Sequence, residues 1–364
     1  MKNIIIFSIY DEQGKIKEYV LFLINQLKSV SDDIIIVING TMNDLDLNKL
    51  KQFTTNIIIR ENYGYDFWAY KEVLNKYKIL INKYDTITLC NDTFFGFFKN
   101  LRDIYNEMEE KKCDFWGINY INNEILDYIE SYFLVFKNKI INNNELYNYI
   151  EETEKYAVKD VIDVHVIFEV GLFQYLKRKN YIYESYIKSN NLNIYKKPYE
   201  CIVKYNLPIL KKKAIVSIDE NQMKKIIQYL MNNTSYNVNM ILANKDKIYK
   251  NNFFNIETVI SPITLTENTL KLKIKKYKGV YIYGAGIVAR KLWFIYQDIL
   301  INFRGFVISK NAGKLNICGY QVKNIEDIDT TNFCIIVAMN ISNSKEVYLK
   351  HKNEENYVWL WSEL

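Results

Sequence analysis

The 364-residue sequence contains few of the residues that build zinc and disulfide sites. It has two histidines, His165 and His351, and five scattered cysteines with no CxxC pair. Zinc sites combine closely spaced Cys and His ligands, and secreted disulfide frameworks need sets of paired cysteines. We therefore expect neither kind of site, and the cysteine usage fits a reducing cytosol.

Long hydrophobic runs are absent as well. No stretch of 18 apolar residues occurs, and charged residues interrupt the opening MKNIIIFSIYDEQGK too soon for a signal peptide. The densest basic cluster is KLKIKKYK, residues 271–278. It could be a solvated linker face or a contact with the anionic inner face of the membrane. We expect a cytoplasmic protein, either free or peripheral on the cytoplasmic membrane.

The net charge of +6 is spread along the chain without a block of six like charges. No nucleic-acid-binding motif accompanies the lysines, so nucleic acid is not an expected partner. The length exceeds what one core usually fills, and two domains are expected.

The first third alternates apolar runs with amphipathic stretches. The runs predict strands over 3–9, 33–39, 56–60 and 85–92, and helices are expected over 15–30, 67–78 and 99–110. Strands that are apolar on both faces and alternate with helices are typical of a mostly parallel sheet covered on both sides. The run over 56–60 is likewise interpreted as a buried strand.

The remaining sequence completes this domain and adds a second one. Strands are expected over 114–119 and 131–136, followed by mainly helical sequence to about residue 235. A βαβ pattern then begins at YIYGAGIVARKL, with later strands over 305–309 and 332–339. We predict an α/β protein with a first domain over 1–255, a linker over 256–276 and a small Rossmann-like domain over 277–364.

Polar residues follow each of the first four predicted strands. They are Tyr10, Asn39, the stretch from Arg60 to Asp66, and Asn91-Asp92. In an open parallel sheet these positions meet at one edge, where ligands bind. Arginine, amides and carboxylates together suit a phosphorylated, hydroxyl-rich ligand. The alternative is a set of capped polar loops, with Asp66 as the N-cap of the helix that follows.

Several separated motifs resemble the rhamnan synthesis F family of bacterial glycosyltransferases. They are IYDEQGKIKEYV, RENYGYDFWAYK, NDTFFG, DFWGIN, ESYFLVF and FEVGL, and the resemblance covers about residues 3–205. Phe97 stands where the family usually has proline. The resemblance implies a glycosyltransferase A-type fold and transfer of a sugar, typically rhamnose from its dTDP donor, onto a cell-surface polysaccharide.

The resemblance also implies roles for the residues at the sheet edge. Donor contacts are expected from Tyr10, Asn39, Arg60, Asn62, Gly64, Tyr65, Asp66, Trp68, Lys71 and Asn91. Within this set, Asp66 would bind a sugar hydroxyl. Tyr65 and Trp68 would pack against the sugar or base. Asp92 occupies the place of the acidic metal motif, so Mg²⁺ or Mn²⁺ could bind there, although only one carboxylate is present.

An inverting transferase needs a base for the acceptor hydroxyl. The candidates lie in DVIDVHVIFEVGL, and Glu169 is preferred because it belongs to the FEVGL motif, with Asp163 next and Asp160 after it. His165 lies four residues before Glu169 and would share its helical face. The alternative is that Glu169 is a solvated helix residue.

The C-terminal turn contains Gly284, Gly286 and Ala289, which form a GxGxxA pattern between a strand and a helix. A dinucleotide site would have an acidic residue about twenty positions later, but Ser309 and Lys310 stand there. NAD is therefore not the expected ligand, and another nucleotide, a phosphate or an assembly role stays open.

The resemblance therefore implies a glycosyltransferase, and more specifically an inverting rhamnosyltransferase. Its partners would be a nucleotide-diphosphate sugar and an oligosaccharide or polyprenyl-linked glycan acceptor, and homo-oligomer formation stays open. The alternatives are a non-catalytic nucleotide- or glycan-binding protein, and an oxidoreductase or epimerase that acts through the C-terminal domain.

Overall fold

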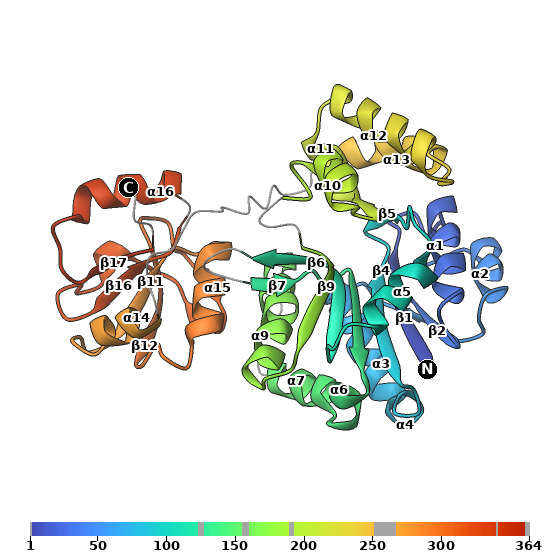
Figure 1. Ribbon diagram of the computed structural model, residues 1–364. Coiled ribbons are helices and arrows are strands. Elements are labelled where there is room, and N and C mark those ends of the chain that lie inside the picture. Colours follow the sequence, from blue (N-terminus) through green and yellow to red (C-terminus); the bar gives the residue numbers. More distant parts are fainter. Residues whose placement is uncertain are drawn as a thin grey trace. The chain divides into compact units, whose positions relative to one another are not determined.

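The computed structural model describes residues 2–122, 127–154, 160–188, 193–250, 267–339 and 341–360. These residues form two compact units, each with its own sheet (Figure 1). The first unit comprises Met1–Asn122, Tyr128–Glu151 and Tyr175–Asn255, and the second Asn123–Asp127, Glu152–Gln174 and Ile256–Leu364. None of the helices in the described ranges is long and apolar enough to span a membrane.

The first unit is built on a mixed sheet with strand order β3-β2-β1-β4-β8-β6-β7, to which β9 adds beside β6. Strands β1 to β4 are mutually parallel, and β8 runs antiparallel to β4 and β6. A separate two-stranded ribbon joins β5 and β10. The strands are β1 (Asn3–Tyr10), β2 (Asp33–Asn39), β3 (Ile57–Arg60), β4 (Thr86–Asn91), β5 (Phe94–Gly96), β6 (Phe115–Asn122), β7 (Asp127–Ile129), β8 (Phe133–Lys137), β9 (Tyr183–Ile187) and β10 (Ile209–Lys211).

Helices cover both faces of this sheet, as the apolar strands require. Alternate residues of β1, namely Ile5, Phe7 and Ile9, join a core cluster with residues of α1, α2, α5 and α10 to α13. Helix α3 packs against β1 and β2. The helices are α1 (Glu18–Lys28), α2 (Asp44–Lys51), α3 (Tyr65–Lys76), α4 (Lys78–Ile81), α5 (Leu101–Glu109), α6 (Asn138–Asn142), α7 (Glu145–Thr153), α9 (Gly171–Arg178), α10 (Pro198–Tyr205), α11 (Lys212–Ser217), α12 (Glu220–Asn233) and α13 (Asn239–Lys250).

Helix α1 shows how the sequence pattern produces this packing. Its buried residues, Tyr19, Val20, Leu23, Ile24 and Leu27, recur at three- and four-residue spacing and form one apolar stripe. The stripe lies in the same core cluster as β1 and β2. This helix therefore fixes the chain that leads out of β1 over the carboxyl edge of the sheet.

The second unit has a parallel five-stranded sheet with order β15-β12-β11-β16-β17. Its strands are β11 (Val280–Tyr283), β12 (Phe303–Ile308), β15 (Lys323–Asn324), β16 (Cys334–Val337) and β17 (Tyr357–Trp359), beside a hairpin of β13 (Asn316–Ile317) and β14 (Tyr320–Gln321). Its helices are α8 (Val161–Val164), the π-helix η1 (His165–Val170), α14 (Glu267–Ile274), α15 (Ile287–Tyr296), the 3₁₀ helix η2 (Ile325–Asp327) and α16 (Ile341–His351).

The predicted fold class is confirmed as far as the architecture goes: a mostly parallel α/β sheet is followed by a small Rossmann-like domain with its own parallel sheet. The predicted domain boundaries stay a prediction. Of the predicted linker, residues 256–266 lie outside the described residues, and Glu267–Ile274 forms α14. The segment 152–174, which the sequence assigned to the first domain, belongs to the second unit.

One sequence interpretation was wrong. The run that forms β3 was expected to be buried on both faces, yet Ile59 is 50% exposed and Ile57 is half-buried. The reason is position, because β3 pairs only with β2 at the edge of the sheet. An apolar run does not reveal on its own whether a strand is central or at an edge.

Candidate active site

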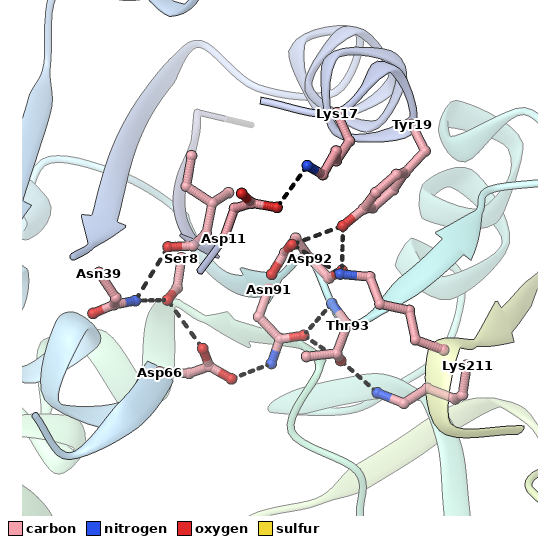
Figure 2. A network of polar contacts seen from close by, with 12 residues as sticks. Ser8, Asp11, Lys17, Tyr19, Asn39, Asp66, Asn91, Asp92, Thr93 and Lys211 are labelled. Carbon is pink, nitrogen blue, oxygen red and sulfur yellow. Dashed lines mark hydrogen bonds and ion pairs between the residues drawn. The ribbon is translucent and has the colours of Figure 1, made fainter. Parts of the chain in front are cut away.

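The candidate site lies where the parallel strands β1 to β4 end. Because these strands run in the same direction, their carboxyl ends share one edge of the sheet. Ser8 lies near the end of β1, Asn39 and Asn91 end β2 and β4, and Asp66 lies in the first turn of α3 after β3. All four side chains belong to one hydrogen-bonded network, which Figure 2 shows.

Asp66 is at the centre of this network. Its Oδ1 accepts a 3.1 Å hydrogen bond from the Ser8 hydroxyl, and its Oδ2 accepts a 2.7 Å bond from the Asn91 amide. Ser8 in turn accepts a 2.8 Å bond from Asn39 Nδ2. Burial, and after it the negative charge of Asp92, raises the pKa of Asp66 to about 6. This carboxyl group can therefore gain or lose a proton near neutral pH.

The network continues from Asn91 to the β10 strand. Thr93 donates its hydroxyl to Asn91 Oδ1 at 2.6 Å and itself accepts a 2.6 Å bond from Lys211 Nζ. Lys211 is 6% exposed and lies over the ring of Tyr132, with its Nζ 4.2 Å from the ring centre. A nearly buried ammonium thus ends a chain of polar groups that begins at β2.

Arg60 reaches the same network from β3 but has protein partners of its own. Its guanidinium donates to Asn39 Oδ1 at 2.6 Å, to the Tyr63 carbonyl at 2.7 Å and to Glu72 Oε2 at 3.1 Å. The side chain is only 10% exposed. Arg60 therefore braces the loop between β3 and α3 against β2.

Asp92 follows β4 and is 5% exposed. Its Oδ2 accepts a 2.9 Å bond from the Tyr19 hydroxyl and forms a 2.9 Å ion pair with Lys212 Nζ. Burial, followed by the charge of Asp92, raises the pKa of Tyr19 well above its usual range, so Tyr19 remains a hydrogen-bond donor. The Lys212 ammonium also lies 4.7 Å from the centre of the Tyr19 ring.

A pocket of about 300 Å³, which includes space open to solvent, adjoins Asp92. Within it, Lys17 pairs with Asp11 at 2.9 Å. Burial alone would raise the pKa of Asp11, but the hydrogen bond and charge of Lys17, together with hydrogen bonds from the Lys15 and Gln13 backbone N–H groups, outweigh it and the pKa is lowered. The lining combines the ends of β1 and β2, the segments that follow them, the start of α1 and one residue after β4: Ile9, Tyr10, Asp11, Lys15, Ile16, Lys17, Tyr19, Val20, Ile38, Thr41, Met42 and Asp92.

Aromatic side chains cluster beside Arg60, at the start of α3. Gly64 (φ +70°) and Tyr65 (φ +55°) are consecutive residues in the left-handed region. A Cβ at Gly64 would lie 2.4 Å from the Trp68 ring, so this corner requires glycine. Tyr63 meets Trp68 edge-on at 5.7 Å, and Lys71 Nζ lies 5.3 Å from the centre of the Trp68 ring.

The predicted donor residues therefore fall into groups. Asn39, Asp66 and Asn91 form the buried network, whereas Tyr10 lines the pocket. Gly64, Tyr65, Trp68 and Lys71 form the aromatic corner with Arg60 beneath it, and Asn62 is exposed there. Helix α3 begins at Tyr65 with Gly64 as its N-cap, so Asp66 is not the cap that the alternative interpretation assumed. The donor roles of these residues stay predictions.

Sequence reasoning missed Ser8, Tyr19, Lys211 and Lys212. Ser8 interrupts the apolar run of β1, which was an available signal for a polar contact inside the sheet. Tyr19 is at a core position of α1, and only its hydroxyl reaches Asp92. Lys211 and Lys212 are about 120 residues from Asp92, and nothing local in ILKKKA points to it.

Glu169 and Asp163, the candidate bases, lie in the second unit. Glu169 Oε1 is 2.5 Å from His165 Nδ1, as the four-residue spacing predicts. Asp163 is 5% exposed and accepts a 2.8 Å bond from Arg290 on α15, which also binds both carboxylate oxygens of Asp160 at 2.9 Å. Their catalytic roles stay predictions.

The predicted glycine turn joins β11 to α15. Gly284 (φ +136°) is held so close to Ala338 that a Cβ would lie 2.5 Å from the Ala338 carbonyl oxygen. Around Gly286 a Cβ would meet nothing within 4 Å, and Ala289 is fully buried in α15. After β12, the Ser309 hydroxyl bonds the Tyr283 hydroxyl at 2.9 Å. The Cβ side of Gly286 is therefore open, whereas Gly284 is closely packed.

Metal-binding groups are sparse. Among the described residues, no group of three or more His, Cys, Asp or Glu side chains is arranged to hold a metal ion. Asp92 is the candidate at the sheet edge, and its Oδ2 already contacts an ammonium and a phenol. The divalent cation stays a prediction.

Curated relatives and solved structures resemble parts of this chain. An uncharacterized protein, y4gN, of Sinorhizobium fredii is 27% identical over 158 residues, which cover 42% of this chain and 41% of that protein. The virulence protein VirA of Vibrio anguillarum is 28% identical over 124 residues, covering 34% of this chain and 39% of that protein. The match thus spans about two fifths of the length of these relatives.

Two solved structures share little sequence with the chain. The glycosyltransferase GlyE of Streptococcus pneumoniae is 12% identical, with a TM-score of 0.34 and coverage of 100% of this chain and 94% of that one. A cytidylyltransferase of Leptospira borgpetersenii is 10% identical, with a TM-score of 0.33 and coverage of 65% and 99%. The family model of rhamnan synthesis protein F matches residues 34–303, a range that includes Asn39, Asp66, Asn91 and Asp92 but not the pocket residues of β1 and α1. The chain therefore belongs to the rhamnan synthesis protein F family.

Proposed function

We propose that the chain is a glycosyltransferase that uses a nucleoside-diphosphate sugar. The observation that carries this proposal is the solvent-open pocket at the carboxyl ends of β1 and β2, which Lys15, Lys17 and Asp92 line. Ligands of open α/β sheets bind at this edge. Lysine ammonium groups suit a diphosphate, and the rim residue Tyr10, 47% exposed, offers a ring for stacking on a base or sugar.

The transfer would exchange one bond at the anomeric carbon of the donor sugar. The oxygen of an acceptor hydroxyl bonds to this carbon while the bond to the diphosphate oxygen breaks. The diphosphate leaves with additional negative charge, and lysines at the pocket would stabilise it most strongly as that charge develops. A base takes the hydroxyl proton, and Glu169 is the candidate for this role.

The finer assignment is an inverting rhamnosyltransferase acting on a cell-surface polysaccharide or its lipid-linked precursor. Its support is the family, which is named for rhamnan synthesis, and the separated motifs of the sequence. Attack from the face opposite the diphosphate, with one base and no covalent intermediate, inverts the anomeric centre.

A ligand screen tests the proposal. The chain is heated with dTDP-rhamnose, UDP-glucose, GDP-mannose or NAD, since a ligand that binds the folded state raises its melting temperature. We expect dTDP-rhamnose to raise it most. Lys17→Met should lower this affinity about tenfold, which is the loss of about 1.4 kcal/mol, while the exposed Lys224→Met in the same unit should not.

The screen also separates the alternatives. Transfer to a rhamnan-type oligosaccharide acceptor, followed by mass spectrometry, should accompany donor binding. If the donor binds but is neither transferred nor slowly hydrolysed, the chain would be a binding protein instead. Stabilisation by NAD alone would favour an oxidoreductase or epimerase.

A further inference from the structure

Two consecutive lysines enter the first unit's site from a distant part of the chain. Strand β10 pairs antiparallel with β5, which begins two residues after Asp92, and Lys211 lies opposite Phe94. The backbone N–H of Lys212 then donates to the Thr93 carbonyl at 3.0 Å. This ribbon fixes both lysine backbones beside the end of β4.

Both ammonium groups are held in place. Lys211 Nζ bonds Thr93 Oγ1 at 2.6 Å, and Lys212 Nζ pairs with Asp92 at 2.9 Å. The Lys212 side chain is 21% exposed and Asp92 only 6%, so the cation is the more accessible member of the pair. A lysine carries three N–H donors, and the bond to Asp92 uses one of them.

The carboxylates nearby are poorly placed for a divalent cation. Asp92 Oδ2 accepts from Lys212 and Tyr19, and an ion bound to Asp92 would face the Lys212 ammonium at close range. Asp66 has Oδ1 bonded to Ser8 and Oδ2 bonded to Asn91. Asp11, which lines the same pocket as Asp92, pairs with Lys17 through Oδ2 and accepts two backbone N–H groups at Oδ1. Mg²⁺ at phosphate sites is usually held by one or two carboxylates together with the substrate phosphates.

We propose that Lys212, held by Asp92 and supported by Lys211, provides the positive charge for the donor's diphosphate in place of a divalent cation. Asp92 is then the anchor of the lysine and not a metal ligand. A fixed ammonium stabilises the diphosphate both on binding and on departure without reorganisation. This inference rests on the proposed function, because it concerns the same donor.

The first experiment measures metal dependence directly. Calorimetry with dTDP as the probe is carried out on the full chain in EDTA and again in 5 mM Mg²⁺ or Mn²⁺. The two dissociation constants should agree within about twofold, since no metal takes part. An affinity that appears only with Mg²⁺ or Mn²⁺ overturns the inference.

The second experiment tests the lysine. In EDTA, Lys212→Met should weaken dTDP binding tenfold or more, which is about 1.4 kcal/mol per factor of ten. Lys212→Arg keeps the charge and should recover most of this loss. Lys224→Met, which removes an exposed lysine of α12, is the matched control and should bind as the unaltered chain does.

Circular dichroism of each variant, together with the binding of Lys212→Arg, distinguishes a folding defect from a binding defect. If Lys212→Met is folded and binds dTDP normally, or if Lys212→Arg binds as weakly as Lys212→Met, the inference is wrong. Metal-dependent dTDP binding would remove the inference and leave the proposed function intact. Absence of dTDP and nucleotide-sugar binding under all these conditions would remove both.

Discussion

The Asn91 amide donates a 2.7 Å hydrogen bond to Oδ2 of Asp66, and this bond ties the end of β4 to the first turn of α3. The acceptor is a partly buried carboxyl group whose pKa is raised to about 6, first by desolvation and then by the charge of Asp92. A raised pKa means that the folded state holds the proton more tightly than the unfolded state does.

The first prediction is therefore a pH effect on stability. Between pH 3.8, the unfolded value, and about 6, the folded chain binds more protons at Asp66 and its stability falls as the pH rises. Above pH 6 the raised pKa lowers the free energy of unfolding by about 2–3 kcal/mol in total, at 1.36 kcal/mol per pKa unit. Asp66→Asn removes the titrating group, so its stability relative to the unaltered chain should rise across this window.

Urea unfolding at half-unit steps from pH 4.5 to 7.5 measures this difference. The Asn side chain presents an N–H₂ group where Asn91 also donates, and this mismatch lowers the variant's stability at every pH. The mismatch shifts the variant's plot of unfolding free energy against pH by a constant amount and does not change its slope. Parallel plots for the variant and the unaltered chain would contradict the assignment of a raised pKa to Asp66.

The second prediction concerns Arg60 as a brace. Its guanidinium bonds Asn39, Glu72 and the Tyr63 carbonyl and is 10% exposed. Arg60→Ala should lower the free energy of unfolding by about 2–3 kcal/mol, since charge-assisted bonds are lost and Asn39 keeps a buried acceptor without its donor. Glu72→Gln should cost under about 1 kcal/mol, because that partner is 45% exposed.

Measurements of donor affinity distinguish the structural role of Arg60 from the donor-binding role that the sequence predicts. If Arg60 binds the diphosphate, calorimetry on folded Arg60→Ala should show a loss of about 1.5–3 kcal/mol in dTDP-sugar binding. Unchanged unfolding free energy in Arg60→Ala would show that the three bonds do not act as a brace.

Asp66 and Arg60 also show how far the sequence could predict the site. Apolar runs and strand-end polarity predicted the parallel strands and placed Asp66, Asn91 and Arg60 at one edge, because these features are local. Sequence patterns did not predict that Arg60 is turned toward Asn39 and Glu72. Side-chain direction depends on tertiary packing, which leaves no periodic signal.

The parts that were missed have the same physical origin. Strand β10 has three residues, and its partner β5 precedes it by more than a hundred positions, so Lys211 and Lys212 could not be connected with Asp92. The edge position of β3 depends on which strands fail to pair beside it. Similarly, the segment that carries Glu169 and Asp163 lies in sequence between β8 and β9 of the first sheet but packs against α15 in the second unit.

The third prediction addresses the ion pair in the second unit. Arg290 Nη1 bonds Asp163 at 2.8 Å, and their side chains are 12% and 7% exposed. Arg290→Met leaves a buried carboxylate without its cation, which typically costs about 3–5 kcal/mol. Adding Asp163→Asn should restore part of the loss, because the unpaired charge is removed.

Hydrogen exchange of peptides covering residues 160–174 reports this local stability without assuming two-state unfolding. Lys350→Met, which breaks the exposed pair with Glu346, is the control and should leave the exchange of these peptides unchanged. Equal destabilisation in Arg290→Met and in the double variant would show that charge pairing is not the cause.

The fourth prediction is that the Gly284 turn does not bind NAD. Lys310, exposed after β12, stands near the place where an acidic residue would hold the ribose, and Ser309 is bonded to Tyr283. Equilibrium dialysis of the full chain with NAD should show no binding at micromolar concentration. Binding in that range, abolished by Gly286→Val, would reassign the second unit as a dinucleotide domain.

The last prediction tests Glu169 as the base. Its carboxylate lies 2.5 Å from His165 Nδ1, and the side chain is 16% exposed. Glu169→Gln keeps the shape but cannot accept a proton, so donor affinity should be unchanged while turnover falls by about two to four orders of magnitude. Glu152→Gln, an exposed carboxylate earlier in the same unit, is the matched control and should retain turnover. Single-turnover transfer and calorimetry on the same preparations separate the two quantities.

A folded Glu169→Gln that transfers sugar at nearly the unaltered rate would assign Glu169 a structural role with His165. Because Asp163 is bonded to Arg290, Asp163→Asn would then be tested beside Asp160→Asn, and only loss of turnover without loss of the local hydrogen-exchange protection would support either as the base.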